Sequence, residues 1–341
     1  MADDPDGRAC GNPAAGLISP VKRFSPIYSV EQRNLRTHPA GPVELAGFSY
    51  PGHILWKNYG AYALLNHCRK VHGCMEEGNI TISLDDAERA RYARQLIYPD
   101  FGEAGQLCLK KAHVLIAGVG GLGSPNAVNL TCAGVGKLTL VDGDSVDISN
   151  LNRQTLHWEK DVGVPKVISG AVKLAAMNSR TEIVPLHVRI TAENAAELLA
   201  GVDLVMDCLD NMEARFVLNA YCVRNNIPFI HGGIRGLDGE VITIIPGRTP
   251  CLECLYPKGI GGADNMPFPA FGATPALVAS LQTMEAIKLL AGFGELLAGK
   301  MLFISGESME FSLIETNRKK ECRICGESID EHQGDTASVP Q

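Results

Sequence analysis

Residues 113–123 read HVLIAGVGGLG, and this stretch decides the fold. Its mostly apolar start predicts a buried strand over His113–Ala117, and small and apolar residues at helical spacing predict a helix that ends at Ala133. Between them lies a glycine turn formed by Gly118, Gly120, Gly121 and Gly123. Such a turn lets the backbone approach a phosphate, whose charge then lies against free N–H groups at the helix start. The stretch therefore predicts a strand, turn and helix that bind a nucleotide.

A second apolar run, Lys137–Val141, predicts the next strand and places Asp142 at its end. An acid about twenty residues after a glycine turn commonly binds a ribose hydroxyl. Taken alone, this pattern is typical of an NAD- or FAD-binding Rossmann unit.

Strands and helices then alternate along the chain. Strands are expected over 182–188, 203–207 and 228–231, and helices over 165–177, 192–199 and 212–224. This alternation predicts an α/β fold with a Rossmann-like, doubly wound, mostly parallel sheet. Ligands of such sheets collect at the carboxyl ends of the strands.

Beyond Gly232 the pattern changes, and antiparallel strands are expected to continue the sheet. A strand is predicted over 240–246, a long helix over 275–290 with Gly292 as its C-cap, and a closing hairpin over 301–314. Upstream, Ser83–Asp86 resembles a capping box that opens one helix reaching Ile97 and carrying Arg94.

Composition limits the functional classes. The chain has 341 residues, 45% of them hydrophobic and 20% charged, as in ordinary globular proteins. A formal net charge of −7 without a basic block argues against nucleic acid as the main partner. No apolar run is long enough to span a membrane, and the acidic start MADDPDGRACGNP is no secretory signal. We expect a cytoplasmic protein, because its 11 cysteines fit a reducing compartment better than a disulfide framework.

Three regions are expected. Residues 1–80 form an N-terminal extension of unknown role, partly disordered or helical, with a possible helix over 54–74. Cys68, His72 and Cys74 in it could ligate a metal, but no fourth ligand lies nearby, so an ordinary surface segment is favoured. Residues 81–326 form the main domain, and residues 327–341 form a tail.

Two C-x-x-C pairs give the strongest metal signal. They are Cys251 with Cys254 and Cys322 with Cys325. Four thiolates on two short turns suit tetrahedral Zn²⁺ and leave no position for water, so a structural C-terminal zinc site is predicted.

The residues after Asp142 argue against a dehydrogenase. Polar and charged residues follow on the predicted loop, at the start of the next helix, and around the end of the strand predicted over 203–207. They are Asp144, Ser149, Asn150, Arg153, Gln154, Lys166, Asp207, Asp210, Asn211 and Arg215. A nicotinamide enzyme has no use for an arginine and a lysine aimed at the phosphates plus an acid at the next strand end. An enzyme that transfers a nucleotidyl group needs cations around the α-phosphate and leaving pyrophosphate, and an acid for Mg²⁺.

The spacing GVGGLG…VDGDSVDISNLNRQ…VGVPK…DCLDN…CLEC…CRIC resembles the ThiF/MoeB/HesA family, bacterial relatives of ubiquitin-activating enzymes. The resemblance covers Ser83–Gly326, about seven-tenths of the chain. It implies that Mg·ATP is used to adenylate a carboxyl group, typically the C-terminal Gly-Gly of a ubiquitin-like sulfur carrier. RYARQL (residues 91–96) is similar to the family helix whose arginine enters the partner subunit's site, which implies a homodimer with Arg94 acting in trans.

The resemblance also implies roles for single residues. Gly121 would abut the phosphates and Asp142 the ribose, while Lys166 would act on phosphate charge. Asp210 would bind Mg²⁺ with Asn211 beside it. The other nucleotide-binding positions would be Gly118, Gly120, Gly123, Asp144, Ser149, Asn150, Arg153 and Gln154.

One feature departs from the family. Members that perform covalent sulfur or thioester chemistry usually carry a cysteine after the first C-x-x-C, whereas the loop Leu255–Pro275 has none. Cys208 is expected to be a small buried residue.

Because the loop has no cysteine, adenylation of a small-molecule or peptide carboxylate in cofactor or natural-product biosynthesis is the main alternative. A non-catalytic scaffold and an NAD-linked oxidoreductase are weaker hypotheses.

Overall fold

The computed structural model describes residues 82–256 and 269–326. The proposed extension (1–80), its possible helix and metal ligands, and the tail (327–341) lie outside the described residues. The boundaries expected for these regions therefore stay predictions.

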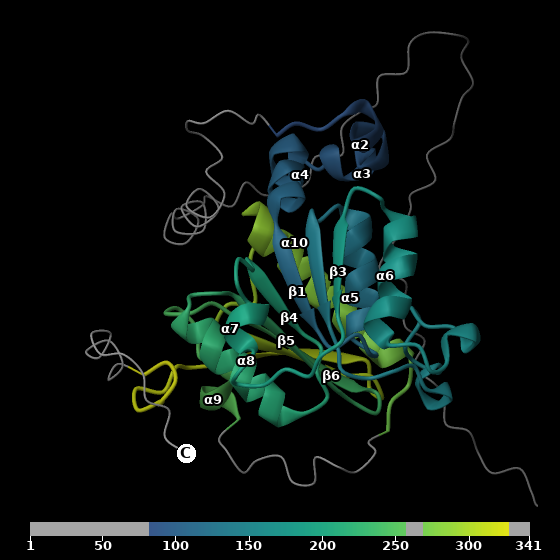
Figure 1. Ribbon diagram of the computed structural model, residues 1–341. Coiled ribbons are helices and arrows are strands. Elements are labelled where there is room, and N and C mark those ends of the chain that lie inside the picture. The colour runs from purple at the N-terminus through teal and green to yellow at the C-terminus, as the bar shows by residue number, and fades with distance from the viewer. Residues whose placement is uncertain (1–81, 257–268, 327–341) are drawn as a thin grey trace, which may run out of the picture. The chain divides into compact units, whose positions relative to one another are not determined.

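One eight-stranded sheet runs through the described residues in the order β3-β2-β1-β4-β5-β6-β7-β8 (Figure 1). Strands β1 to β5 are parallel, and β6 to β8 continue the sheet antiparallel. This confirms the expected α/β fold and its antiparallel continuation. The strand bounds are His113–Ala117 (β1), Lys137–Val141 (β2), Glu182–Leu186 (β3), Leu204–Asp207 (β4), Phe229–Arg235 (β5), Asp238–Ile244 (β6), Lys300–Ser305 (β7) and Glu310–Glu315 (β8).

Helices pack on both faces of this sheet, as a doubly wound fold requires. One core contains residues from α4 (Gly102–Lys111), α5 (Gly123–Ala133), α6 (Lys166–Met177) and α10 (Ala273–Ala291). The other core contains residues from α7 (Ala195–Leu198), α8 (Met212–Arg224) and α9 (Leu252–Leu255). The long helix α10 ends at Gly292 in the left-handed region, which confirms the predicted C-cap.

The helix predicted from Ser83–Asp86 to Ile97 is wrong in two respects. Its N-cap is Asp85, because the longer Glu88 side chain reaches back to the Asp85 N–H while Asp85 accepts from the Glu88 N–H. The segment also forms two short helices, α2 (Asp86–Arg91) and α3 (Ala93–Leu96), separated by Tyr92. Tyr92 is buried, and its hydroxyl accepts a hydrogen bond from Asn178, a tertiary contact that local spacing could not predict.

The topological switch point lies at β1, which pairs with β2 on one side and β4 on the other. The glycine turn follows β1 at this point. Gly118 has φ of +87°, and a Cβ there would lie 2.8 Å from the Cys208 carbonyl oxygen. A Cβ at Gly123 would lie 1.8 Å from the Gly118 carbonyl oxygen. Glycine is therefore required at both positions, and the turn lies directly against the residues that follow β4.

Candidate functional site

Asp142 fastens the glycine turn to the end of β2. Its carboxylate accepts a hydrogen bond from the Val119 N–H (2.7 Å) and another from the Asp144 N–H (2.8 Å). Gly118 in turn donates to the Val141 carbonyl (2.8 Å). The turn and the residue predicted to bind ribose are therefore neighbours.

Lys166 opens α6 and is only 7% exposed. Its backbone N–H donates to the Asp144 carbonyl (3.0 Å), and its Nζ lies 3.3 Å from Asp144 Oδ2. Arg189 lies 3.0 Å from the other Asp144 oxygen. Asp144 thus positions one buried and one exposed cation, and an anionic ligand could compete with it for both.

Arg153 lies beside the glycine turn. A Cβ added to Gly121 would meet Arg153 Cγ at 3.7 Å. The guanidinium donates to the Ser149 carbonyl (3.0 Å) and to Asn152 Oδ1 (2.8 Å), which orders the loop that carries it. Ser149 and Asn150 belong to a short 3-10 turn, in which Asp147 accepts hydrogen bonds from the backbone and hydroxyl of Ser149.

Gln154 is buried beneath the same turn, with Nε2 3.4 Å from the position of a Cβ on Gly120. Its buried Oε1 has no hydrogen-bond partner among the described residues. The contacts thus bring together the glycine turn, Asp142, Asp144, Gln154 and Lys166, with Arg153 alongside.

Asp210 follows β4 and is exposed. Its carboxylate makes no hydrogen bond or ion pair with the described parts of the chain, including Lys166 and Arg153. The next residue, Asn211, caps α8 by accepting a hydrogen bond from the Ala214 N–H (2.9 Å). Asp210 therefore lies between a strand end and a helix start with its carboxylate available to a ligand.

Arg94 is not part of the same site within one chain. It is exposed on α3, where the adjacent Gln95 donates to the Ala133 carbonyl at the C-terminal end of α5. The glycine turn lies at the opposite end of α5, about 16 Å away for 11 residues.

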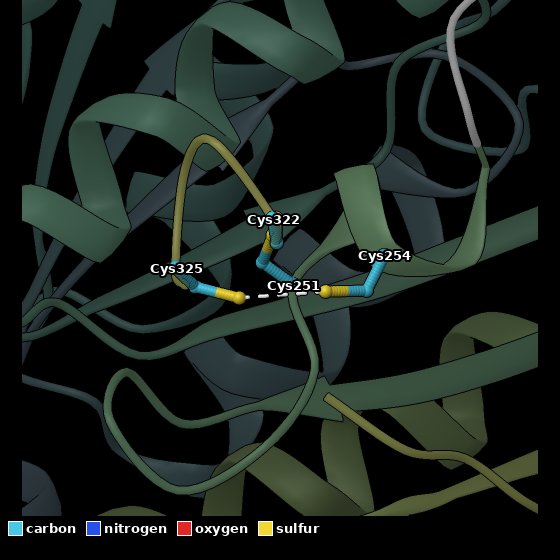
Figure 2. A group of neighbouring side chains, drawn as sticks. All are labelled: Cys251, Cys254, Cys322 and Cys325. Atoms are coloured by element: carbon cyan, nitrogen blue, oxygen red, sulfur yellow. Dashed lines mark hydrogen bonds between the residues drawn. The ribbon is translucent and has the colours of Figure 1, made fainter. Parts of the chain in front are cut away.

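The four predicted zinc ligands meet (Figure 2). Their sulfur atoms all lie within 4.8 Å of one another, with 3.6 Å between Cys251 and Cys322 and 3.4 Å between Cys254 and Cys325. Sulfurs that share one tetrahedral zinc at about 2.3 Å lie about 3.8 Å apart, so the geometry fits. Burial raises the pKa of Cys254 to about 11, and a bound cation would favour its thiolate.

Cys208 is buried, as expected, and is no candidate nucleophile. Its thiol lies 3.4 Å from Asn126 Nδ2, and burial raises its pKa far above the ordinary value. A buried neutral thiol is a poor nucleophile.

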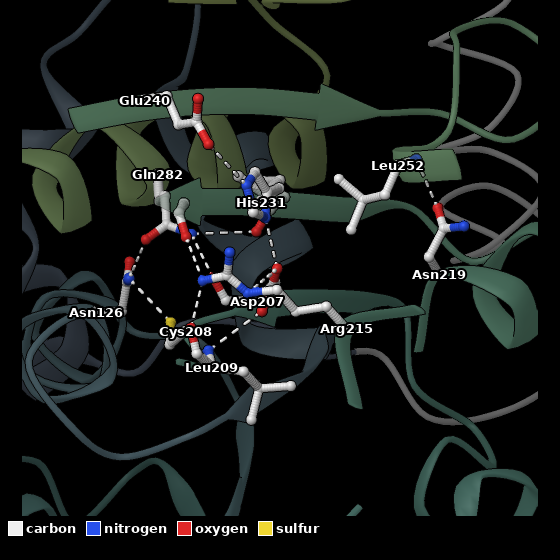
Figure 3. A network of polar contacts seen from close by, with 12 residues as sticks. Asn126, Asp207, Cys208, Leu209, Arg215, Asn219, His231, Glu240, Leu252 and Gln282 are labelled. Atoms are coloured by element: carbon white, nitrogen blue, oxygen red, sulfur yellow. Dashed lines mark hydrogen bonds and ion pairs between the residues drawn. The ribbon is translucent and has the colours of Figure 1, made fainter. Parts of the chain in front are cut away.

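A buried ionic cluster joins the end of β4 to β5, β6 and α8 (Figure 3). Its members are Asp207, Arg215, His231 and Glu240. His231 Nδ1 lies 2.6 Å from Asp207 Oδ2, and His231 Nε2 lies 3.4 Å from Glu240 Oε1. Burial and Arg215 oppose the charged imidazole, but the hydrogen bonds to both carboxylates outweigh them and raise the pKa of His231.

The sequence analysis named Asp207 and Arg215 but missed His231 and Glu240. The spacing of His231 and Glu240 in the sequence does not predict their contact, because they lie on the neighbouring antiparallel strands β5 and β6. The available signal was a histidine in a buried strand followed by two glycines, of which Gly233 leaves room for the Glu240 side chain and Gly232 for Gln282.

Comparison with known proteins is consistent with this geometry. The ThiF family matches residues 92–324. The chain belongs to the ThiF family. SAMP-activating enzyme E1 of Haloferax volcanii is 37% identical over 251 residues, which cover 73% of this chain and 93% of that enzyme. Adenylyltransferase and sulfurtransferase MOCS3 of Drosophila ananassae is 38% identical over 267 residues, covering 75% of this chain and 57% of MOCS3.

Among solved structures, E. coli MccB with ATP has a TM-score of 0.62 and 25% identity, covering 77% of this chain and 90% of MccB. These matches confirm the expected ThiF/MoeB/HesA-type adenylyltransferase. Within the described ranges, no helix of this ThiF-family chain is long and apolar enough to cross a membrane.

His231 and His113 should contribute to stability with opposite dependence on pH. Because the pKa of His231 is raised, its contribution is complete below about pH 6.5 and is lost as the pH rises through the folded-state pKa. The loss in unfolding free energy caused by His231→Gln should therefore shrink between about pH 6 and pH 9. Denaturant titrations of wild type and His231→Gln at a series of pH values measure this loss in unfolding free energy.

His113→Gln is the matched control. Burial lowers the pKa of His113, so its contribution is present above about pH 6.5 and is lost as the pH falls. The effect of His113→Gln should not shrink between about pH 6 and pH 9, and it should decrease only as the pH falls below about 6.5. Parallel pH profiles for the two variants would contradict the assigned charge of His231.

Proposed function

We propose that the protein uses Mg·ATP to adenylate a carboxyl group, most directly the C-terminal Gly-Gly of a ubiquitin-like sulfur-carrier protein, and releases pyrophosphate. The observation that carries this proposal is the gathering of Lys166 and Arg153 around a glycine turn at the switch point of the sheet. Similarity to an activating enzyme E1 and to an adenylyltransferase supports it. The product would serve sulfur transfer in cofactor biosynthesis of the molybdopterin or thiamine type.

The chemistry assigned to these residues is in-line substitution. A carboxylate oxygen attacks the α-phosphorus of ATP, the bond to the β-phosphate oxygen breaks, and an acyl-adenylate and pyrophosphate form. The reacting groups carry like charges, so Lys166 and Arg153 would reduce their repulsion and stabilise the leaving pyrophosphate. Asp142 would orient the ribose, and the glycine turn would leave room for the phosphates.

Asp210 is assigned to Mg²⁺ with Asn211 beside it. An exposed carboxylate without a partner in the described chain fits a hard cation, which prefers oxygen ligands. The bound ion would supply charge neutralisation at the phosphates.

Pyrophosphate exchange tests this assignment. With an active acceptor, Asp210→Ala and Lys166→Ala should each lower the exchange rate by about 100-fold or more, since each removes charge stabilisation worth about 3 kcal/mol. Glu315→Ala, which removes a carboxylate at the exposed edge strand β8, serves as the matched control. Undiminished exchange by Asp210→Ala would refute the magnesium role.

The acceptor panel for this exchange should contain Gly-Gly-tailed carrier proteins and small carboxylates. Exchange with a small carboxylate or peptide but with no carrier would support the alternative substrate class. The absence of cysteine from Leu255–Pro275 favours a reaction that ends at the adenylate in either case. Stabilisation by NAD rather than ATP would contradict both substrate classes.

We also propose a homodimer in which Arg94 enters the partner subunit's site. The support is the position of Arg94, which is exposed at the opposite end of α5 from its own glycine turn. A side chain so placed cannot reach the phosphates of its own subunit. It could reach those of a second copy related by two-fold symmetry.

Mixing inactive subunits tests this arrangement. Arg94→Ala and Asp210→Ala proteins should each be nearly inactive, but a heterodimer of them has one site with an intact Asp210 and a donated Arg94. Subunit exchange between equal amounts should restore exchange activity to about a quarter of wild type, since half of the dimers are mixed and each has one complete site. If the mixture stays inactive although native mass spectrometry shows heterodimers, Arg94 does not act in trans.

We assign Zn²⁺ as a structural ion on Cys251, Cys254, Cys322 and Cys325. Four buried sulfurs would complete its coordination, so it would join the segment after β6 to the segment after β8 without taking part in the reaction.

Metal analysis checks the zinc assignment. Wild-type protein should contain about one zinc per chain, and Cys322→Ser should lose most of it and unfold more than about 5 °C earlier. Cys132→Ser is the matched control, because Cys132 is an exposed thiol outside the cluster. A zinc content unchanged by Cys322→Ser would contradict the assignment.

A further inference from the structure

The turn that carries Asp210 is bonded to the buried ionic cluster through Leu209, the residue before Asp210 (Figure 3). Asp207 at the end of β4 uses one carboxylate oxygen to accept a hydrogen bond from the Leu209 N–H (3.2 Å). Its other oxygen binds His231. Leu209 directly precedes Asp210, so the backbone entering Asp210 is fixed by the Asp207 side chain.

Arg215 holds the same turn from α8. One of its terminal nitrogens donates to the Leu209 carbonyl and to the Gly232 carbonyl, the latter at 3.0 Å. This nitrogen therefore links the turn after β4 to the middle of β5. With Asn211 capping α8 on the other side, the backbone is tied immediately before and after Asp210.

The cluster is balanced in charge. Asp207 is completely buried and His231 is 1% exposed, while the Glu240 side chain is 24% exposed. Two carboxylates face one imidazole and one guanidinium, so the cluster as a whole offers little net charge to a ligand. Its contribution must therefore come through the backbone that it orders rather than through direct attraction of substrate.

His231 also determines which partner Arg215 uses. Arg215 Nε lies 3.5 Å from Asp207 Oδ2 without forming a hydrogen bond to it, and this buried atom has no hydrogen-bond partner among the described residues. His231 occupies that same Asp207 oxygen at 2.6 Å. Without the imidazole, the nearest cation for the buried Asp207 is Arg215, and a shift toward Asp207 would loosen its bonds to Leu209 and Gly232.

We propose that Asp207, His231 and Glu240 form a positioning relay that keeps Arg215 on the Leu209 carbonyl and so sets the position of Asp210 for Mg·ATP. The proposal rests on the function proposed above, because it deepens the role of Asp210. Glu240 acts at the far end of the relay, where it holds Nε2 of His231. His231 is a positioning residue, since it reaches Asp210 only through Asp207, Arg215 and the backbone.

The test compares the Mg²⁺ dependence of two relay variants with that of a matched buried acid. His231→Gln removes the imidazole, and Glu240→Gln removes one charge with little change in volume. The control is Glu285→Gln on α10, where a buried carboxylate accepts hydrogen bonds from Thr243 (2.6 Å) and from the Leu297 N–H (2.7 Å), outside the relay. All variants are made in the full chain.

Two measurements are made on each protein. The first is the Mg²⁺ concentration that gives half-maximal pyrophosphate exchange at saturating ATP. The second needs no turnover: the rise in the thermal unfolding midpoint caused by ATP, measured with and without Mg²⁺. A purely structural role would lower the midpoint of the free protein without changing either Mg²⁺-dependent quantity.

His231→Gln should raise the Mg²⁺ requirement by roughly tenfold or more, since loss of a residue that orients a metal ligand typically costs that much. It should also remove most of the Mg²⁺-dependent part of the thermal shift. Glu240→Gln should act in the same direction with a smaller change, and Glu285→Gln should stay within about twofold of wild type.

Wild-type Mg²⁺ dependence in His231→Gln would overturn the proposal. If that variant does not fold, Glu240→Gln decides the question, because its side chain is partly exposed and the substitution keeps its shape. Equal shifts in the Glu285→Gln control would also overturn it. Wild-type protein could show no pyrophosphate exchange with any acceptor of the panel and still be stabilised by ATP in a Mg²⁺-dependent way. In that case the proposed function fails, while the thermal shifts still test the relay.

Discussion

The site depends on the close packing of backbone against backbone where β1 and β4 end. Gly118 lies directly against the Cys208 carbonyl, and the space available there excludes any side chain. Because the two segments approach so closely, the glycine turn and the turn bearing Asp210 are held next to each other at the switch point. Asp142 fixes the third neighbouring strand end by accepting a hydrogen bond from the Val119 N–H. Protein contacts alone therefore hold the ends of β1, β2 and β4 in place before any ligand binds.

Charges at this edge of the sheet form two groups that differ in burial. After β2, the half-exposed Asp144 carboxylate pairs with the buried Lys166 and the exposed Arg189, and an anionic ligand could compete with it for both. On β4 to β6, Asp207 and Glu240 are matched by His231 and Arg215, which are largely buried and bonded to protein groups. Pairs that include an exposed group can exchange partners at low cost, whereas separating a buried pair is expensive. The first group suits ligand binding, and the second suits positioning.

Much of the fold was predictable, because its signals are local. The strands β1 and β2 have the predicted bounds, since each is an apolar run ended by glycine or an acid, and the helix α8 has them with asparagine at both ends, Asn211 as its N-cap and Asn225 as its C-cap. The predicted helix from Ser83–Asp86 to Ile97 failed because Tyr92 is buried against Asn178, a residue 86 positions away. For the candidate site, spacing identified the glycine turn, Lys166 and the four cysteines, but not His231 or Glu240, whose meeting requires the antiparallel pairing of β5 with β6.

The sequence by itself determined the family, the parallel sheet, the glycine turn after the first strand and the candidate site residues around it. These follow from short-range patterns: apolar periodicity, glycine spacing and polar residues at strand ends. Only the tertiary structure decided that Arg94 lies far from its own glycine turn and that His231 links the carboxylates of Asp207 and Glu240. Each of these depends on contacts between segments distant in the chain, which form when the sheet assembles and its faces are covered by helices.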